Sequence, residues 1–384
     1  MKRKKRIYLD NAATTPIDSR VLSVMEKTAR EIYGNPSSLH KEGILARNVL
    51  TDSRKNIADI LHANPDEVVF TSGGTEANNL ALFGSVSKPV GSHIVVSTIE
   101  HPSVLECVKE LEYRGAEVSY IAPDEKGITS PRAVKDALQK NTVLVSVMYA
   151  NNEIGTIQPL SEIAKTIRVF RGDKIFPVFH TDACQATNYL EMNVLRLGVD
   201  LMTFNSSKIY GPKGIGALYV KRGTKLSEQV FGGGQERGIR SGTENVAMVK
   251  GFSEAMRSTL KMKEKETIRL AKLRDYFISS VLKTIPGSIL NGDSVKRLPN
   301  NANISFPEKD GEEMVIALDA RGIAVSTGSA CANIARDGKV SHVMNALGAL
   351  KPRAVGAVRF TLGRETKKED LDYVLNALRD IMKR

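Results

Sequence analysis

The chain has 384 residues, of which 41% are hydrophobic and 30 are glycines, a composition typical of a soluble globular α/β protein with one large and one smaller domain. No apolar run approaches the length of about 18 residues that a membrane-spanning helix needs, and no secretory-type apolar segment follows the basic N-terminus. The three cysteines, Cys107, Cys184 and Cys331, provide neither a disulfide framework nor paired metal-ligand spacing. We therefore expect a cytoplasmic protein without a structural metal or a membrane anchor.

The formal net charge is +12, from 55 basic and 43 acidic residues, and five of the basic residues lie at positions 2–6. A basic tail can bind RNA or an acidic partner protein, and its simpler interpretation is a solvated, mobile end. No interleaving of aromatic and basic residues indicates a nucleic-acid surface. Direct nucleic-acid binding is therefore not expected.

Apolar runs typical of β-strands recur with helical patterns between them. Several are continuously apolar, as expected when both faces of a sheet are covered. The alternation of strand and helix predicts a mostly parallel sheet in an α/β fold. The seven predicted strands are Val68–Thr71, His93–Ser97, Glu117–Ile121, Val143–Met148, Phe176–Thr181, Leu201–Phe204 and Gly216–Val220.

The chain changes character near Gly251. From there to Thr284 it reads as one long, charged amphipathic helix that Pro286 and Gly287 end. We expect a large domain over residues 16–255 and a small α/β domain built from residues 1–15 and 256–384. The predicted elements of the small domain are the strands Ala302–Phe306, Ile323–Ser326 and Val358–Leu362 and the helices Glu312–Ala320 and Lys368–Met382.

Lys208 lies in the turn between two apolar strands of the predicted sheet. An unpaired ammonium loses hydration in such a place, so the lysine needs a function or a partner. One function is a Schiff base with the aldehyde of pyridoxal phosphate, a cofactor that also needs a carboxylate for its pyridinium nitrogen. Asp182, at the end of a preceding strand, is the candidate for that carboxylate. A structural ion pair is the competing interpretation of the lysine.

Ligands of parallel sheets bind beyond the carboxyl ends of the strands, and Thr71, Asp182 and Asn205 lie at or just past such ends. Gly74 and Thr75 follow the first of these ends, where a helix opens. Glycines allow close backbone approach and a helix N-terminus offers free N–H groups with positive potential, a combination that binds phosphate. An ordinary N-cap is the alternative.

Polar side chains follow two further strands. The imidazole of His101 can stack on an aromatic cofactor and move protons, or it can be a satisfied loop histidine. The amide of Asn152 can bind a carboxylate or a ring hydroxyl, unless the segment only forms a turn. Gln185, three residues past Asp182, can reach the same ring oxygen, and His180 is given no role.

The second half of the chain adds two anion-binding candidates. Thr243 ends a glycine-rich stretch that begins at Phe231, and both a phosphate-facing threonine and a plain loop remain open. Arg359 lies inside an apolar strand and needs an anion there. A substrate carboxylate held by two hydrogen bonds would serve, and so would a structural salt bridge.

Cys331 is the cysteine with the context of a reactive thiol. It follows the small polar run 326–330, and charged residues come after it. Such a segment, about residues 326–342, is typical of a mobile loop in which a thiol is accessible and its thiolate can react. Cys107 and Cys184 read as small buried residues.

Taken together, these segments resemble the NifS/IscS-type cysteine desulfurases, class V aminotransferases that are pyridoxal phosphate enzymes of fold type I. The resemblance runs over nearly the whole chain, with its motifs in the order of the family. They are Tyr8–Thr15, Gly34–Ser38, Thr71–Asn79, Asn151–Gly155, Thr181–Ala186, Lys208–Gly214, Gly232–Thr243, Ser326–Cys331 and Arg359–Gly363.

The resemblance implies a role for each candidate and a homodimer whose active sites lie at the subunit interface. Lys208 would hold the cofactor, Cys331 would accept the sulfur, and His101 would stack on the ring. Asp182 would face the pyridinium and Gln185 the ring oxygen. The remaining roles implied are phosphate binding by Gly74, Thr75, Asn205, Ser207 and, from the other subunit, Thr243, and binding of the cysteine carboxylate by Asn152 and Arg359.

The triplet before the lysine departs from the family pattern. The family usually has Ser-x-His there, and this chain has Asn205-Ser206-Ser207. Asn205 and Ser207 can still donate hydrogen bonds, but no histidine can add charge. The setting of Cys331 is similar to that of the long-loop group of the family.

The implied activity is removal of sulfur from L-cysteine, which leaves L-alanine and a persulfide on Cys331 for transfer to an iron–sulfur scaffold or a tRNA thiouridylase. Two further enzyme interpretations use the same scaffold, a selenocysteine lyase and an aminotransferase. A non-catalytic RNA-binding or scaffold protein is the interpretation from another class, and it predicts a colourless protein.

Overall fold

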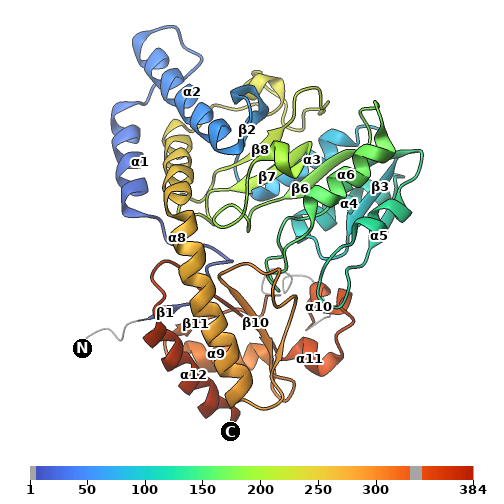
Figure 1. Ribbon diagram of the computed structural model, residues 1–384. Coiled ribbons are helices and arrows are strands. Elements are labelled where there is room, and N and C mark those ends of the chain that lie inside the picture. The colour runs from blue at the N-terminus through green and yellow to red at the C-terminus, as the bar shows by residue number, and fades with distance from the viewer. Residues whose placement is uncertain (1–5, 329–339, 384) are drawn as a thin grey trace.

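The computed structural model describes residues 6–328 and 340–383, and its largest element is a seven-stranded sheet (Figure 1). The strand order is β2-β8-β7-β6-β5-β3-β4. Five of the strands, β3 to β7, pair in parallel as expected for a mostly parallel sheet, and β8 is antiparallel to both its neighbours, β2 and β7. The strands are β2 (Val68–Thr71), β3 (His93–Ser97), β4 (Glu117–Ile121), β5 (Thr142–Ser146), β6 (Val178–Asp182), β7 (Leu201–Asn205) and β8 (Gly216–Val220).

Both faces of this sheet are covered, which explains the continuous apolar runs. Ile94 and Val96 pack in a cluster with the helices α3 (Gly74–Ser85) and α4 (Pro102–Tyr113), whereas Val95 between them packs on the opposite face. Successive side chains of a strand point to opposite faces, so each run supplies both layers. The opposite face is covered by α2 (Lys41–Leu61), α5 (Pro131–Ala137), α6 (Leu160–Arg171), α7 (Val194–Leu197) and the first part of α8 (Val246–Thr284).

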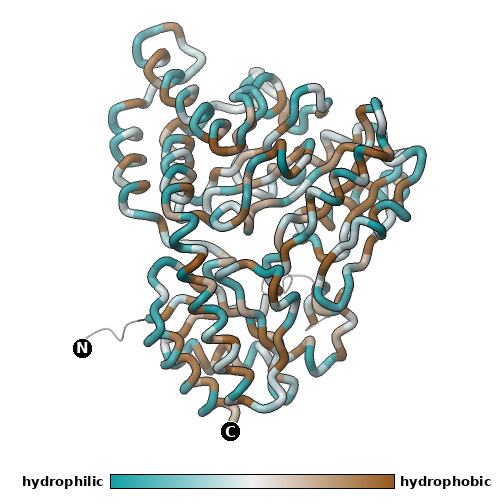
Figure 2. Tube along the Cα trace, viewed as in Figure 1, coloured by the Kyte–Doolittle hydropathy of each residue, from teal (hydrophilic) through white to brown (hydrophobic). Residues whose placement is uncertain are grey.

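Helix α8 is 39 residues long and extends from the neighbourhood of α1 (Ser19–Glu31) and α2 to the C-terminal part of the molecule (Figure 1). It begins five residues before the predicted start, because the side chain of Asn245 caps it by accepting from the N–H of Met248 at 3.1 Å. Figure 2 shows hydrophilic and hydrophobic residues interleaved along it. Within the described ranges, no helix is both long enough and apolar enough to cross a bilayer.

The C-terminal part contains two small sheets and its own hydrophobic cluster. One sheet has the antiparallel order β12-β10-β9, and the other pairs β1 with β11 in parallel. Leu9, Phe277 and Phe360 belong to this cluster, which supports the predicted two-domain division, although the division stays a prediction. The elements are β1 (Ile7–Tyr8), β9 (Ile289–Leu290), β10 (Asn301–Ser305), β11 (Ile323–Ala324), β12 (Ala357–Thr361), α9 (Gly311–Asp319), α10 (His342–Ala346), α11 (Lys351–Val355) and α12 (Lys368–Met382), and two short 3₁₀ turns lie elsewhere at Pro65–Glu67 and Glu236–Gly238.

The predicted strand bounds were wrong by one or two residues in several places. Strand β6 begins at Val178, not at Phe176, because Pro177 has no N–H to give to the ladder. Strand β11 ends at Ala324, and Ser326 instead forms a single bridge to Arg359. This bridge sets the N-terminal side of the cysteine-bearing segment against β12.

Candidate active site

A cavity of about 500 Å³ lies beyond the carboxyl ends of the strands, where the sequence predicts a ligand. Its wall is formed by residues at or just past the carboxyl ends of β2, β6 and β7, together with residues of the N-terminal segment and of β12. Among the described residues, every predicted site residue except Thr243 lines it. These are Gly74, Thr75, His101, Asn152, Asp182, Gln185, Asn205, Ser207, Lys208 and Arg359. Cys331 lies outside the described residues, although Ser326 and Gly328 ahead of it line the cavity.

The N-terminus of α3 forms a narrow cradle at one end of the cavity. Gly74 is the first residue of α3, and a Cβ at this position would meet Cys184 Sγ at 2.9 Å and Asn205 Nδ2 at 3.2 Å. A side chain at position 74 would therefore crowd these two groups. Free N–H groups of the first helical turn, the Asn205 amide and the Thr75 hydroxyl are suitable phosphate donors.

Lys208 lies in the turn between β7 and β8 and reaches the N-terminal segment. Its Nζ donates a hydrogen bond to the carbonyl oxygen of Ala13, and its own carbonyl accepts from Asn188 Nδ2 at 2.6 Å. The side chain is half-buried at the cavity wall. Strand β7 leads into this turn and β8 leads out, so these two neighbouring strands determine where the amine is held.

Asp182 is held rigidly at the end of β6. Oδ2 accepts a 2.8 Å hydrogen bond from Asn78 Nδ2, and Oδ1 accepts from the N–H of Cys184 at 2.9 Å. The residue is 7% exposed. Both partners are N–H donors, so they fix the orientation of this carboxyl group at the cavity wall.

His101 caps α4 and also lines the cavity, so the capping interpretation is present and stacking on a cofactor stays a prediction. Nδ1 accepts from the N–H of Ser103 at 3.1 Å, so a neutral ring carries its proton on Nε2. Burial lowers the pKa of His101, and the charges of Lys208 and His342 lower it further against the opposing effect of Asp182. The ring is therefore uncharged at neutral pH and free to stack.

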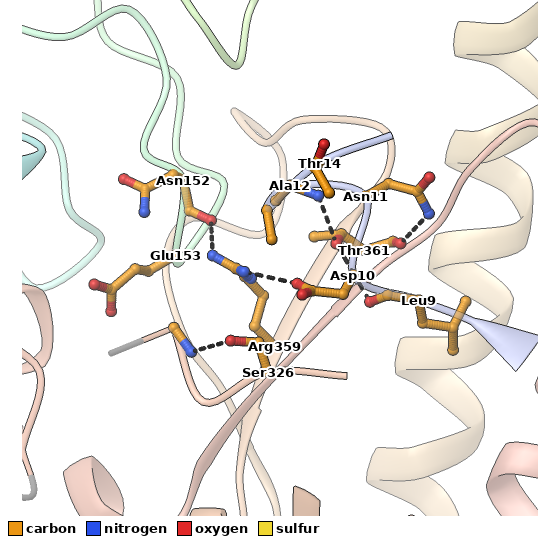
Figure 3. Close-up of polar contacts among 12 residues, drawn as sticks. Leu9, Asp10, Asn11, Ala12, Thr14, Asn152, Glu153, Ser326, Arg359 and Thr361 are labelled. Atoms are coloured by element: carbon orange, nitrogen blue, oxygen red, sulfur yellow. Dashed lines mark hydrogen bonds and ion pairs between the residues drawn. The ribbon is translucent and has the colours of Figure 1, made fainter. Parts of the chain in front are cut away.

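Arg359 is the buried cation of the cavity wall. Its Nη2 donates to Asp10 Oδ1 at 2.8 Å and its Nη1 donates to the Asn152 carbonyl at 3.0 Å (Figure 3). The residue is 4% exposed. Its Nε has no hydrogen-bond partner in the part of the chain that the structure describes. The salt bridge predicted as an alternative is present, and it leaves further N–H groups for an incoming carboxylate.

The amides and hydroxyls predicted to bind the cofactor are partly engaged already. Gln185 Nε2 donates to the carbonyl of Ala12 at 2.9 Å. Ser207 Oγ lies 3.5 Å from Asn205 Oδ1 and is the donor of that pair. All three predicted side chains, Gln185, Asn205 and Ser207, still border the cavity.

Thr243 is exposed and does not line the cavity of its own chain. The loop that carries it is attached to α3, because Arg240 Nε donates to Glu76 Oε1 at 2.6 Å and Glu76 also accepts from the N–H of Ser72 at 2.7 Å. The Arg240 guanidinium helps to hold the pKa of the Glu76 carboxyl below its ordinary value, although burial opposes this. Binding of phosphate by Thr243 in a second copy stays a prediction.

Several groups that support the site were missed in the sequence. Asn78, Ser103 and Asp10 hold Asp182, His101 and Arg359 in place. Asn78 lies in a motif that the sequence had singled out, but its partner is 104 residues away. The pairs of Asn78 with Asp182 and of Asp10 with Arg359 leave no local signal, because only the packing of distant elements brings them together.

Two buried carboxyls adjoin cavity-lining residues in the sequence, since Glu100 precedes His101 and Glu153 follows Asn152. Burial raises the pKa of Glu100 well above its ordinary value, and Oε1 accepts from the N–H of Met148. Burial also raises the pKa of Glu153, against the opposing effects of the Ser341 hydroxyl, His342 and Arg359. Glu153 Oε2 accepts from Ser341 Oγ, which is one of the first described residues after the cysteine-bearing segment.

Comparisons with known proteins extend over nearly the whole chain. The family model described as aminotransferase class-V matches residues 7–374. The cysteine desulfurase IscS of Dictyoglomus turgidum is 44% identical over 383 residues, which cover 99% of this chain and 95% of that relative. Cysteine desulfurase IscS 1 of Archaeoglobus fulgidus is 42% identical over 379 residues, which cover 98% of this chain and 97% of that relative.

Solved structures give the same picture. A structure titled NifS-like protein has a TM-score of 0.91 and 34% identity, with 99% of this chain and 100% of that chain covered. A structure titled SspA in complex with cysteine has a TM-score of 0.79 and 31% identity, with 93% of this chain and 99% of that chain covered.

Proposed function

The chain belongs to the class V aminotransferase family, and we propose that it is a pyridoxal phosphate-dependent cysteine desulfurase that converts L-cysteine to L-alanine and a protein-bound persulfide. The resemblance inferred from the motifs, and the fold type I architecture that it implies, are thereby confirmed. The observation that carries the proposal is one cavity that unites an amine, a held carboxylate, an uncharged imidazole and a buried guanidinium. They belong to Lys208, Asp182, His101 and Arg359.

The residues present fit the cofactor. The cradle at Gly74 has no room for a Cβ and suits the phosphate, and Asp182 is a carboxyl group that two N–H donors hold in place. Lys208 would hold the cofactor covalently, and His101 would lie against its ring. When bound, pyridoxal phosphate supplies an aldehyde for amines and a ring that accepts electrons.

The protein groups would then bind the substrate and move its protons. Arg359, with the amide of Asn152, would bind the α-carboxylate and so orient the Cα–H bond. The Lys208 amine would accept the Cα proton of the substrate. Asp182 would keep the proton on the ring nitrogen by accepting a hydrogen bond from it.

We propose Cys331 as the sulfur acceptor. Its thiolate would attack the substrate sulfur, so that an S–S bond forms while the Cβ–S bond breaks. The electron pair of the broken bond stays with the carbon skeleton, which takes up protons to become alanine, and the sulfur remains on Cys331 as a persulfide. The overall exchange balances without an external oxidant or reductant.

We further propose a homodimer in which Thr243 completes the phosphate site of the other copy. Its exposure, and the ion pair that joins its loop to α3, support this assignment. We propose a cytoplasmic location, because a reducing compartment keeps Cys331 a thiol. The persulfide would pass to an acceptor protein such as an iron–sulfur scaffold or a tRNA thiouridylase.

The test of the function is the product spectrum of the purified, cofactor-supplemented protein. With L-cysteine we expect equal amounts of alanine and of sulfur released by a reducing thiol. A keto acid formed in place of alanine would indicate an aminotransferase, and preferential turnover of selenocysteine would indicate a lyase for that substrate. A colourless protein that leaves L-cysteine intact and binds RNA in a salt-dependent way would overturn the proposal.

A further inference from the structure

The carboxylate of Asp10 and the guanidinium of Arg359 form an ion pair in the wall of the active-site cavity (Figure 3). The atoms Asp10 Oδ1 and Arg359 Nη2 lie 2.8 Å apart, and the side chains are 21% and 5% exposed. On its other side the guanidinium donates to the Asn152 carbonyl at 3.0 Å. A planar guanidinium held by acceptors on two of its nitrogens has a fixed orientation.

We infer that Asp10 is a positioning residue for substrate recognition, which holds Arg359 in the orientation that meets the α-carboxylate of an amino acid. This inference rests on the proposed function, in which Arg359 binds that carboxylate. The guanidinium has five N–H donors in a rigid fork, and Asp10 and Asn152 each take one. The remaining donors include Nε, which lacks a partner among the described residues.

A purely structural function explains the Asp10 carboxylate poorly, because the backbone around it is held by other contacts. The N–H of Leu9 donates to the carbonyl of Ala324 at 2.9 Å, and the carbonyl of Leu9 accepts from the N–H of Thr361 at 2.7 Å. Ala12 donates to Thr361 Oγ1 at 2.9 Å. Within the described chain, the side chain of Asp10 hydrogen-bonds only to Arg359. The segment therefore stays in place when the carboxylate is removed.

The negative charge of Asp10 also indicates that this residue orients Arg359 and does not help to attract the substrate. A carboxylate next to Arg359 reduces the net positive charge that an incoming carboxylate meets, so Asp10 does not increase electrostatic attraction. What it provides is order, since the arginine side chain would otherwise lose rotamer freedom each time a substrate binds. A pre-oriented Arg359 should therefore increase the difference in affinity between amines that carry a carboxylate and amines that lack one.

The experiment compares L-alanine with ethylamine, which differ by the carboxylate alone. Each is titrated into the holoenzyme, and the dissociation constant is taken from the visible absorbance of the bound cofactor. For Asp10→Asn we expect the preference for L-alanine to fall about ten-fold, with ethylamine binding unchanged. Asp10→Glu, which restores the charge, should recover part of the preference. Retained cofactor absorbance shows that each variant is folded.

The matched control is Asp18→Asn. Asp18 pairs with Arg364 at 3.1 Å, both side chains are 14% exposed, and neither residue is among the described residues that line this cavity. The preference of the Asp18→Asn variant for L-alanine over ethylamine should equal that of the wild type. An unchanged or increased preference in Asp10→Asn overturns the inference. If Arg359→Ala also keeps the full preference, the proposed function of Arg359 fails as well, which distinguishes the two failures.

Discussion

The hydroxyl of Ser341 donates a 2.5 Å hydrogen bond to the carboxylate of Glu153, and both residues are buried. Gly328 packs on the same carboxylate, since a Cβ there would lie 3.0 Å from Glu153 Oε2. Gly328 and Ser341 flank the segment that contains Cys331. One carboxyl in the turn after β5 therefore contacts the chain on both sides of the proposed sulfur acceptor, next to the residue whose carbonyl holds Arg359.

The contact at Gly328 predicts the effect of Gly328→Ala. The residue has φ +82°, so an alanine is strained there and its Cβ also crowds Glu153. We expect a loss of about 1–2 kcal/mol in unfolding free energy from the backbone alone and a further loss from the crowding, measured by denaturant unfolding. The control is Gly322→Ala, at φ +81° with no atom within 4 Å of the added Cβ. Equal losses in the two variants would contradict the contact.

The position of Lys208 predicts that Lys208→Ala abolishes turnover of L-cysteine. The variant lacks both the amine that holds the cofactor and the group that moves the Cα proton. Its visible absorbance should differ from that of the wild type, and borohydride should no longer attach the cofactor to residue 208, as mass spectrometry can show. Lys213→Ala is the control, because Lys213 also lines the cavity but has no assigned chemical step. A wild-type absorbance band in Lys208→Ala would refute the assignment.

The proposed acceptor predicts that Cys331→Ser keeps the yellow colour and loses persulfide formation. A serine oxygen is a poor acceptor for the substrate sulfur, whereas no cofactor contact is assigned to residue 331. Persulfide can be detected by alkylation and mass spectrometry after exposure to L-cysteine. Cys107→Ser serves as the control, since burial raises the pKa of the Cys107 thiol to about 12 and keeps it unreactive. Wild-type sulfide release by Cys331→Ser would remove Cys331 from the mechanism.

The cradle at the start of α3 predicts that Gly74→Ala weakens cofactor binding about ten-fold or more. The added Cβ would meet Cys184 Sγ at 2.9 Å and Asn205 Nδ2 at 3.2 Å, so the phosphate end of the site must shift. Equilibrium dialysis against pyridoxal phosphate measures the affinity. The double variant Gly74→Ala with Cys184→Ala should regain part of it, because the smaller side chain removes the first contact. No recovery would place the cause elsewhere.

The burial of His180 predicts that the protein loses stability as the pH falls below neutral. His180 lies fully buried in strand β6, and burial lowers its pKa to about 4 from an ordinary value of about 6.5. Between these values the unfolded chain binds a proton that the folded chain does not, so stability rises with pH over this window and is lost as pH falls through it. The full loss is about 3 kcal/mol. Between pH 7 and pH 4, the free energy of unfolding should change less with pH for His180→Gln than for the wild type. An identical pH dependence in the two proteins would contradict the assignment.

The strands of the sheet and the candidate site, although not the strand order, could be anticipated for local reasons. The runs around Val95 are apolar at every position because both faces are covered, and Thr71, Asp182 and Asn205 end their strands as predicted. Parallel strands bring such ends to one edge of a sheet whatever lies between them. The cavity could therefore be predicted before any contact was known.

What the sequence by itself determined is the local pattern along the chain. This pattern includes alternating strands and helices, a lysine and an aspartate next to strand ends, and motifs in the order of the family. Only the tertiary structure decided which groups hold them, such as Asn78 on Asp182 across 104 residues and Asp10 on Arg359 across 349. The physical reason is that strand and helix periodicities are properties of neighbouring residues. Hydrogen bonds between distant side chains depend on how the packed elements meet, and no local pattern records that.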